Sequence, residues 1–275
     1  MILRPLHPLP PASTESVPAW DAVLRTQTMK YESCWMITQP SHAALAGELA
    51  ATTSATQFPT PDAQLLQAIS LHDAGWGIPD AQAIMKSRSV RSQEPPSFVT
   101  ATAPQFVEAW SNSIDTCEPI SAAGGYVVSR HFWRLAQERL NSMPEENREG
   151  RSPQRAPSLR TAGVEDRRNL DTFLKNETRR QKKLAGSQPL AIEQLELLTD
   201  LLQFCDLLSL YICCGASESV TFPEYFGVRL RVSNQDESYI LDPPVLKSGA
   251  QLSVAALRYP ATKEESSRQI RVRIG

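Results

Sequence analysis

Histidine is rare in this chain of 275 residues, and most of its copies fall where they could do chemistry. Of the four histidines, His42, His72 and His131 stand beside small or apolar residues in segments that are expected to be helical. Asp206 is flanked by apolar residues in the same way. A buried imidazole or carboxylate is costly unless it is hydrogen-bonded, paired or coordinated. One shared cation would satisfy these groups together with Asp73, the residue that follows His72.

The pair His72 and Asp73 places an imidazole and a carboxylate on neighbouring positions near the end of an expected helix. Gly75 and Gly77 follow, and a turn distorted at Gly75 would let both side chains lean toward one ion. Two neutral imidazoles and two carboxylates form a mixed nitrogen and oxygen site with room for water on an octahedral ion such as Mn, Fe, Co, Ni or Mg. Zinc also binds such donors. The donor set therefore predicts a divalent metal ion as cofactor and leaves its identity open.

Three expected helices must bring these groups together. Ser41 is a suitable N-cap for a helix that begins at His42, in a stretch rich in alanine and leucine. A second helix is expected over 61–74, with its apolar face facing the core. A long apolar helix over 192–213 contains Asp206.

The segments expected along the chain combine into a mainly α fold. Residues 1–18 are rich in proline and predict a loosely docked arm. Residues 19–214 are expected to form a helical bundle, with a long loop over 78–104 and a polar, mobile loop over 141–163. Residues 215–275 contain alternating and β-branched stretches, which predict a small C-terminal antiparallel β appendage.

Composition excludes several classes of protein. The net charge of -2 and the pI near 6.1 provide no general attraction to nucleic acid. The longest apolar run, 195–214, is interrupted by polar residues, which favours a buried helix over a membrane span. The first twelve residues lack the apolar stretch of a secretory signal, and the five cysteines lack paired CxxC spacing, which favours reduced thiols. We expect a cytoplasmic protein without a nucleic-acid or membrane partner; whether it forms a homo-oligomer stays open.

The order of the candidate ligands resembles the HD-domain superfamily of metal-dependent phosphohydrolases. The H...HD...D signature of that superfamily is similar to His42, His72 with Asp73, and Asp206, within the phrases ITQPSHAALAGELA, AISLHDAGWG and CDLLSLYIC. These phrases also resemble an uncharacterised bacterial family of unknown function in that group, over most of the chain. The resemblance implies an HD-like helical bundle, these four residues as metal ligands, and hydrolysis of a small phosphorylated metabolite or nucleotide.

Further residues are expected around the metal. Asp73 and His131 are candidate catalytic residues, with His131 as a proton donor or phosphate contact, although a packing role fits His131 equally well. Dinuclear members of the superfamily use additional histidines, and this chain has only His131 to offer for a second site. A single ion is therefore expected. Trp76, Lys86 and Arg130 are candidates for substrate binding because they lie near the motif residues in the sequence.

Two other interpretations stay open. The same scaffold could hold a metal or nucleotide as a non-enzymatic sensor or interaction module. Alternatively, the buried polar residues could serve only the stability of a helical protein.

Overall fold

The computed structural model describes residues 1–275 except 8, 12–14, 90–93, 144–163, 236–237 and 263–264. The helices are α1 (Ala19–Thr28), α2 (Gln39–Ala51), α3 (Ala63–Ser70), α4 (Gly77–Ser89), α5 (Ala103–Cys117), α6 (Ala122–Ser142), α7 (Val164–Ala185) and α8 (Ile192–Cys214), with short 3-10 turns η1 (Ala74–Trp76) and η2 (Phe98–Thr100). The strands are β1 (Ile2–Pro5), β2 (Val17–Pro18), β3 (Cys34–Ile37), β4 (Val220–Thr221), β5 (Arg231–Gln235), β6 (Ser238–Asp242), β7 (Gln251–Tyr259) and β8 (Ser267–Ile274).

These strands form one sheet in the order β1-β3-β7-β8-β6-β5-β4-β2. The pairs β2–β4 and β6–β8 are parallel, and the other neighbours are antiparallel. Along β8, Ile270, Val272 and Ile274 are buried, whereas Arg271 and Arg273 between them are exposed. This alternation gives the strand one core face and one solvent face.

The expectation of a mainly α fold with a small C-terminal β appendage was wrong. Strands from the first forty residues complete the sheet, because β3 pairs with both β1 and β7. The four residues of β1 are all buried, so the proline-rich segment 1–18 begins with a core strand and not with a loose arm. β1 shows no apolar and polar alternation, because it is buried throughout, so its sequence has no period-two pattern. β3 lies within 28–38, where aromatic and large apolar residues suit a short strand or an extended lead-in, but its pairing with β1 and β7 was not expected.

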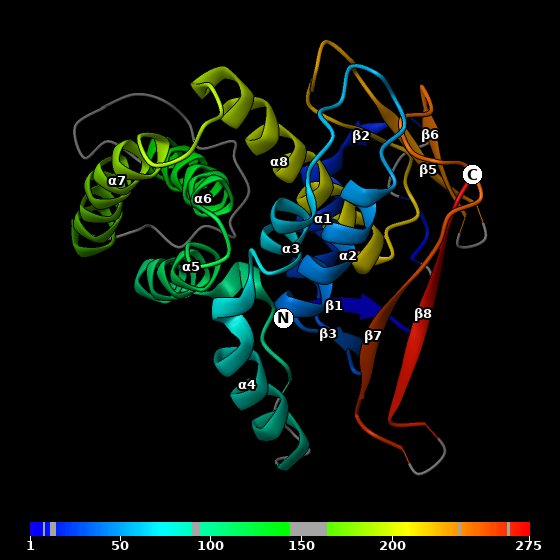
Figure 1. The fold of residues 1–275 in the computed structure, drawn as a ribbon. Coiled ribbons are helices and arrows are strands. Elements are labelled where there is room, and N and C mark those ends of the chain that lie inside the picture. The colour runs from blue at the N-terminus through cyan, green and yellow to red at the C-terminus, as the bar shows by residue number, and fades with distance from the viewer. Residues whose placement is uncertain (8, 12–14, 90–93, 144–163, 236–237, 263–264) are drawn as a thin grey trace, which may run out of the picture.

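The helices form a layered arrangement beside the sheet. Figure 1 shows α5, α6 and α7 grouped on one side, β7 and β8 on the other, and α1, α2, α3 and α8 between them. Helix α8 packs against α1, α2 and α6 and so joins the layers. Among the described residues, α8 is long and apolar enough to cross a membrane by length and composition, but 72% of its apolar window is buried inside the protein. Its apolar surface is therefore covered by the protein's own elements.

Glycines permit two close contacts near the ends of α2 and α3. A Cβ on Gly47 of α2 would lie 1.9 Å from the Ser70 Oγ and 3.1 Å from the Ser70 Cα of α3. A Cβ on Gly75 would lie 2.0 Å from the backbone oxygen of Ala109 in α5. The absence of a side chain at both positions lets α2, α3 and α5 approach closely around the turn that follows α3.

Several boundaries differ from those expected from the sequence. The N-cap of α2 is Thr38, whose side chain accepts a hydrogen bond from the Ser41 amide, so Ser41 is not the cap. The segment 78–104 is not mainly a loop, because α4 occupies its first half. The loop expected over 141–163 lies, from residue 144 on, outside the described residues.

Candidate metal centre

His42 lies in the first turn of α2 and points toward α8. Its Nδ1 is 2.9 Å from the Ser209 Oγ, and its Nε2 is 2.7 Å from the Asp73 Oδ2. The Ser209 hydroxyl donates to the backbone oxygen of Asp206 at 2.8 Å, so its oxygen accepts from His42. This network assigns a proton to His42 Nδ1 and directs Nε2 toward the carboxylate.

His72 and Asp73 lie in the turn between α3 and η1, just beyond the helix that was expected to contain them. His72 Nδ1 donates to the backbone oxygen of Ile69 at 2.8 Å, which fixes the ring and leaves Nε2 facing the site. The Gly75 amide donates to the Ser113 Oγ at 2.9 Å, so the turn is held against α5. The distortion at Gly75 expected from the sequence is thus a tight 3-10 turn packed on a neighbouring helix.

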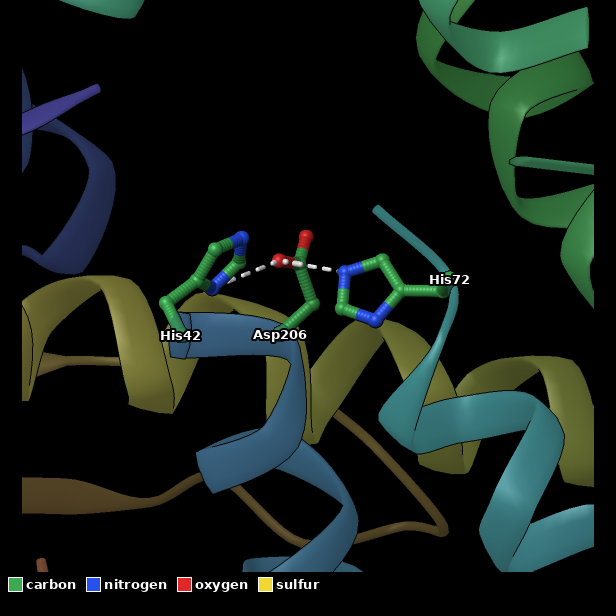
Figure 2. A group of neighbouring side chains, drawn as sticks. All are labelled: His42, His72 and Asp206. Carbon is green, nitrogen blue, oxygen red and sulfur yellow. Dashed lines mark hydrogen bonds and ion pairs between the residues drawn. The ribbon is translucent and has the colours of Figure 1, made fainter. Parts of the chain in front are cut away.

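Asp206 projects from the middle of α8 between the two imidazoles, as Figure 2 shows. Its Oδ1 lies 3.3 Å from His72 Nε2 and 3.8 Å from His42 Nδ1. One potential ligand atom from each of these three residues lies within 4.8 Å of the other two. Asp73 adjoins the group, with its Oδ2 3.8 Å from His72 Nε2. Ligand bonds of about 2.0–2.2 Å to one ion place its donor atoms roughly 3–4.4 Å apart, and the distances from His72 Nε2 to Asp206 Oδ1 and Asp73 Oδ2 fall in this range. Because His42 Nδ1 donates to Ser209, His42 would bind an ion through Nε2.

The donor set has an excess of negative charge at its centre. The Nδ1 atoms of His42 and His72 donate their protons to Ser209 and to the backbone oxygen of Ile69. If either imidazole is neutral, its Nε2 therefore has no proton, and the lone pair of Nε2 faces a carboxylate oxygen. Such a contact is repulsive unless a proton or a metal ion lies between the atoms. These residues therefore fit a divalent cation.

The pKa shifts have the same origin. Burial lowers the pKa of His72, but the charge of Asp73 and the hydrogen bond and charge of Asp206 outweigh it and raise the pKa to about 9. Burial raises the pKa of Asp206, but the hydrogen bond and charge of His72 and the other imidazoles lower it to about 2. In the metal-free protein, a proton on His72 is the cation that the cluster holds at neutral pH.

His131 reaches the same cluster from α6. Its Nε2 lies 3.6 Å from the Asp206 Oδ2, and its ring stands nearly perpendicular to that of His72, with centroids 5.6 Å apart. Burial lowers the pKa of His131 to about 4. Its Nδ1 is buried and has no hydrogen-bond partner among the described residues. His131 is therefore a neutral imidazole with one polar atom unsatisfied.

A cavity of about 450 Å³ opens beside the cluster. The cavity is lined by His42, Asp73, His131 and Asp206. Trp76, which the sequence analysis gave as a candidate for substrate binding, also lines it. The size lies within the range of small-molecule sites. The sequence did not single out the other wall residues, Phe106, Trp110, Gln39 and Arg139 among them, because their types also suit an ordinary core or surface.

The two basic residues expected to bind substrate lie outside this cavity lining. Arg130 pairs with Glu196 of α8 at 3.0 Å, and its guanidinium lies over the Trp133 ring. Residues adjacent on a helix point about 100° apart, so Arg130 faces away from the site that His131 enters. Lys86 is exposed near the end of α4. The cation among the described lining residues is instead Arg139.

The fold and the site define a mixed α and β protein with a buried histidine and aspartate cluster at the wall of a cavity. Residues 26–255 match the model of a family described as a protein of unknown function (DUF3891), and the chain belongs to this family. The matched range includes every residue of the cluster. No curated protein and no solved structure matches the chain.

Proposed function

We propose that this protein is a metal-dependent phosphohydrolase of the HD type, with His42, His72, Asp73 and Asp206 as ligands of one divalent ion. The observation that carries the proposal is the convergence of these groups from α2, the turn after α3, and α8. The order of these residues along the chain resembles the H...HD...D signature of the HD-domain superfamily. An excess of buried carboxylate charge around two imidazole lone pairs favours a cation in their midst.

A divalent ion in this cluster would supply an acidified water and offset the charge of a phosphate group. The protein's own groups hold the ligands in place for that chemistry. Ser209 orients His42, and the backbone oxygen of Ile69 orients His72. Such hydrogen bonds fix the tautomer and the ring plane of a histidine ligand.

His131 has the geometry of a substrate contact. It lines the cavity beside Asp206, and its unsatisfied Nδ1 leaves one polar atom available for a substrate oxygen. Because burial holds its pKa at about 4, the ring stays neutral at pH 7 and carries one proton. As a phosphate contact, the ring would carry this proton on Nδ1 and donate it to a phosphate oxygen. Of the two roles expected from the sequence, a phosphate contact is the one this favours.

The proposal is tested by metal analysis of the purified protein together with hydrolysis of a panel of phosphate monoesters, each with added Mn²⁺, Ni²⁺, Co²⁺, Mg²⁺ or Zn²⁺. We expect one bound ion per chain, and a loss of turnover of at least about 100-fold in Asp73→Asn and His72→Gln. His7→Ala is the matched control, because His7 is exposed. Circular dichroism of each variant separates misfolding from loss of the site. Full activity in both cluster variants, or a wild-type protein that binds none of these ions, contradicts the proposal.

A further inference from the structure

The walls of the cavity are predominantly aromatic and aliphatic. Four rings follow one another along it: Trp76 and Phe106 have centroids 5.3 Å apart, Phe106 and Trp110 5.2 Å, and Trp110 and Phe132 5.4 Å. Phe132 lies 5.0 Å from the His131 ring, so the row ends at the metal cluster. A continuous aromatic and aliphatic wall of this kind favours an apolar body over an anionic one.

The mouth of the cavity also exposes apolar surface. Trp20 of α1 is 43% exposed, lines the cavity and has its ring 6.4 Å from that of Phe98, another wall residue. Leu135 of α6 is half-buried in the same wall. Trp20 therefore joins the apolar lining of the cavity to exposed surface.

Charge in the cavity opposes a polyphosphate. Of the described lining residues, Arg139 alone carries a permanent positive charge, and its guanidinium lies 4.4 Å from the Phe106 ring centroid. Asp73, Asp206 and Glu138 contribute carboxylates to the same lining. One divalent ion offsets the charge of a single phosphate group, but the several charges of a nucleoside diphosphate or triphosphate would meet these carboxylates without further cations.

Two unsatisfied polar atoms mark where the polar end of a ligand would bind. His131 Nδ1 and Gln39 Oε1 are buried and have no hydrogen-bond partner in the part of the chain that the structure describes, and both residues line the cavity. Gln39 begins α2, three residues before His42, and its side chain and His131 both line the cavity beside the histidine and aspartate cluster. A buried polar atom without a partner in the protein indicates a ligand or water that supplies one. Gln39 Oε1 can only accept, so its partner would be a donor such as a water beside the phosphate.

From these observations we infer that the substrate is a phosphomonoester of an apolar alcohol, aliphatic or aromatic, with its phosphate at the histidine and aspartate cluster and its alcohol part along the ring-lined wall. The inference rests on the proposed phosphohydrolase for the chemistry at the phosphate only. The apolar binding stands on the cavity itself.

The test compares methylphosphonate, butylphosphonate and octylphosphonate, which are not hydrolysed, in binding to the metal-loaded full chain by calorimetry. Adenosine triphosphate serves as the charged comparison. Each fully buried methylene tightens binding by about fourfold, which gives an upper limit of roughly 250-fold for the four extra methylenes of octylphosphonate over butylphosphonate. With at least half of that free energy realised, we expect a gain of about 20-fold or more. Equal affinity for the methyl and octyl compounds, or tighter binding of adenosine triphosphate than of octylphosphonate, overturns the inference.

Variants at Leu135 locate the effect. Leu135→Asp introduces a charge into the wall and Leu135→Trp fills it, and both should flatten the dependence on chain length while methylphosphonate binds within about twofold of wild type. Leu197→Asp is the matched control, because Leu197 of α8 is 43% exposed and does not line the cavity. An unchanged chain-length dependence in both Leu135 variants contradicts the inference.

Hydrolysis of butyl phosphate and octyl phosphate is measured in parallel. No turnover with a steep chain-length dependence of binding refutes the phosphohydrolase and supports the apolar pocket. Turnover with a flat dependence supports the phosphohydrolase and refutes the apolar pocket.

Discussion

Binding of a divalent ion should release a proton from His72. In the metal-free protein this imidazole has a pKa of about 9, because the carboxylates of Asp73 and Asp206 outweigh its burial. His72 Nδ1 keeps its proton on the backbone oxygen of Ile69, so the proton displaced by an ion is the one on Nε2. At pH 7, two units below the pKa, His72 should give up about one proton for each ion bound. The apparent affinity for the ion should therefore rise roughly 80-fold between pH 6.5 and pH 8.5.

Titration calorimetry measures this release directly. Protein freed of metal by a chelator is titrated with Ni²⁺ at pH 7.0 in two buffers of different ionisation enthalpy, and the difference in observed heat gives the number of protons released. His7→Ala should behave as wild type, because His7 is exposed and outside the cluster. Heats that agree in both buffers, with an affinity independent of pH, would refute the assignment of the displaced proton to His72.

Three further predictions follow from the same geometry. The free energy of unfolding of the metal-free protein should be greatest near pH 6.5. His72, whose pKa is raised to about 9, stabilises the fold fully below pH 6.5 and loses this contribution as the pH rises toward 9. His131, whose pKa is lowered to about 4, loses its contribution as the pH falls from 6.5 toward 4. Urea unfolding between pH 4.5 and pH 9 measures both limbs, and a monotonic curve would show that these shifts do not govern stability. Gly75→Ala should reduce the free energy of unfolding by about 2 kcal/mol or more, because its Cβ would meet the Ala109 oxygen at 2.0 Å. Gly77→Ala, whose Cβ has Pro40 Cγ as its nearest neighbour at 3.9 Å, should be neutral or about 0.5–1 kcal/mol more stable, and equal losses in the two variants would contradict the close packing at Gly75. Asp206→Asn should weaken Ni²⁺ binding by roughly 100-fold in calorimetry, because it removes a charged donor, whereas unaltered affinity would exclude Asp206 as a ligand.

The cluster could be found from the sequence because its members are chemically unusual where they stand. Asp206 is an acidic residue in a long apolar helix, and His42 and His72 border segments of small and apolar residues. Residues of these types are costly to bury, so their positions indicated a shared cation before any geometry was known. The structure brings these side chains together, and occupancy by a metal remains the prediction to test.

The walls of the cavity and the extent of the sheet could not be found in the same way. Trp110 and Phe106 occur at helical spacing, as core residues do, so nothing in the sequence distinguishes a cavity wall from a packed interior. Nearness in sequence misled the choice of basic residues, because Arg130 leaves α6 on a different side from His131. β1 was missed because it is only four residues long, contains Arg4 and ends at Pro5, and lies in a segment whose prolines favour an irregular arm.

The position of β7 between β3 and β8 has a consequence for the order in which the molecule is assembled. Helix α2, which carries His42, packs on β7, a strand some two hundred residues later in the chain. Contacts that span so much of the chain form slowly, because a long loop must close before any of them stabilises the fold. On a ribosome, the face of α2 that packs on β7 therefore stays uncovered until residues 251–259 have been made, although α3 and α8, which also pack on α2, are synthesised before them.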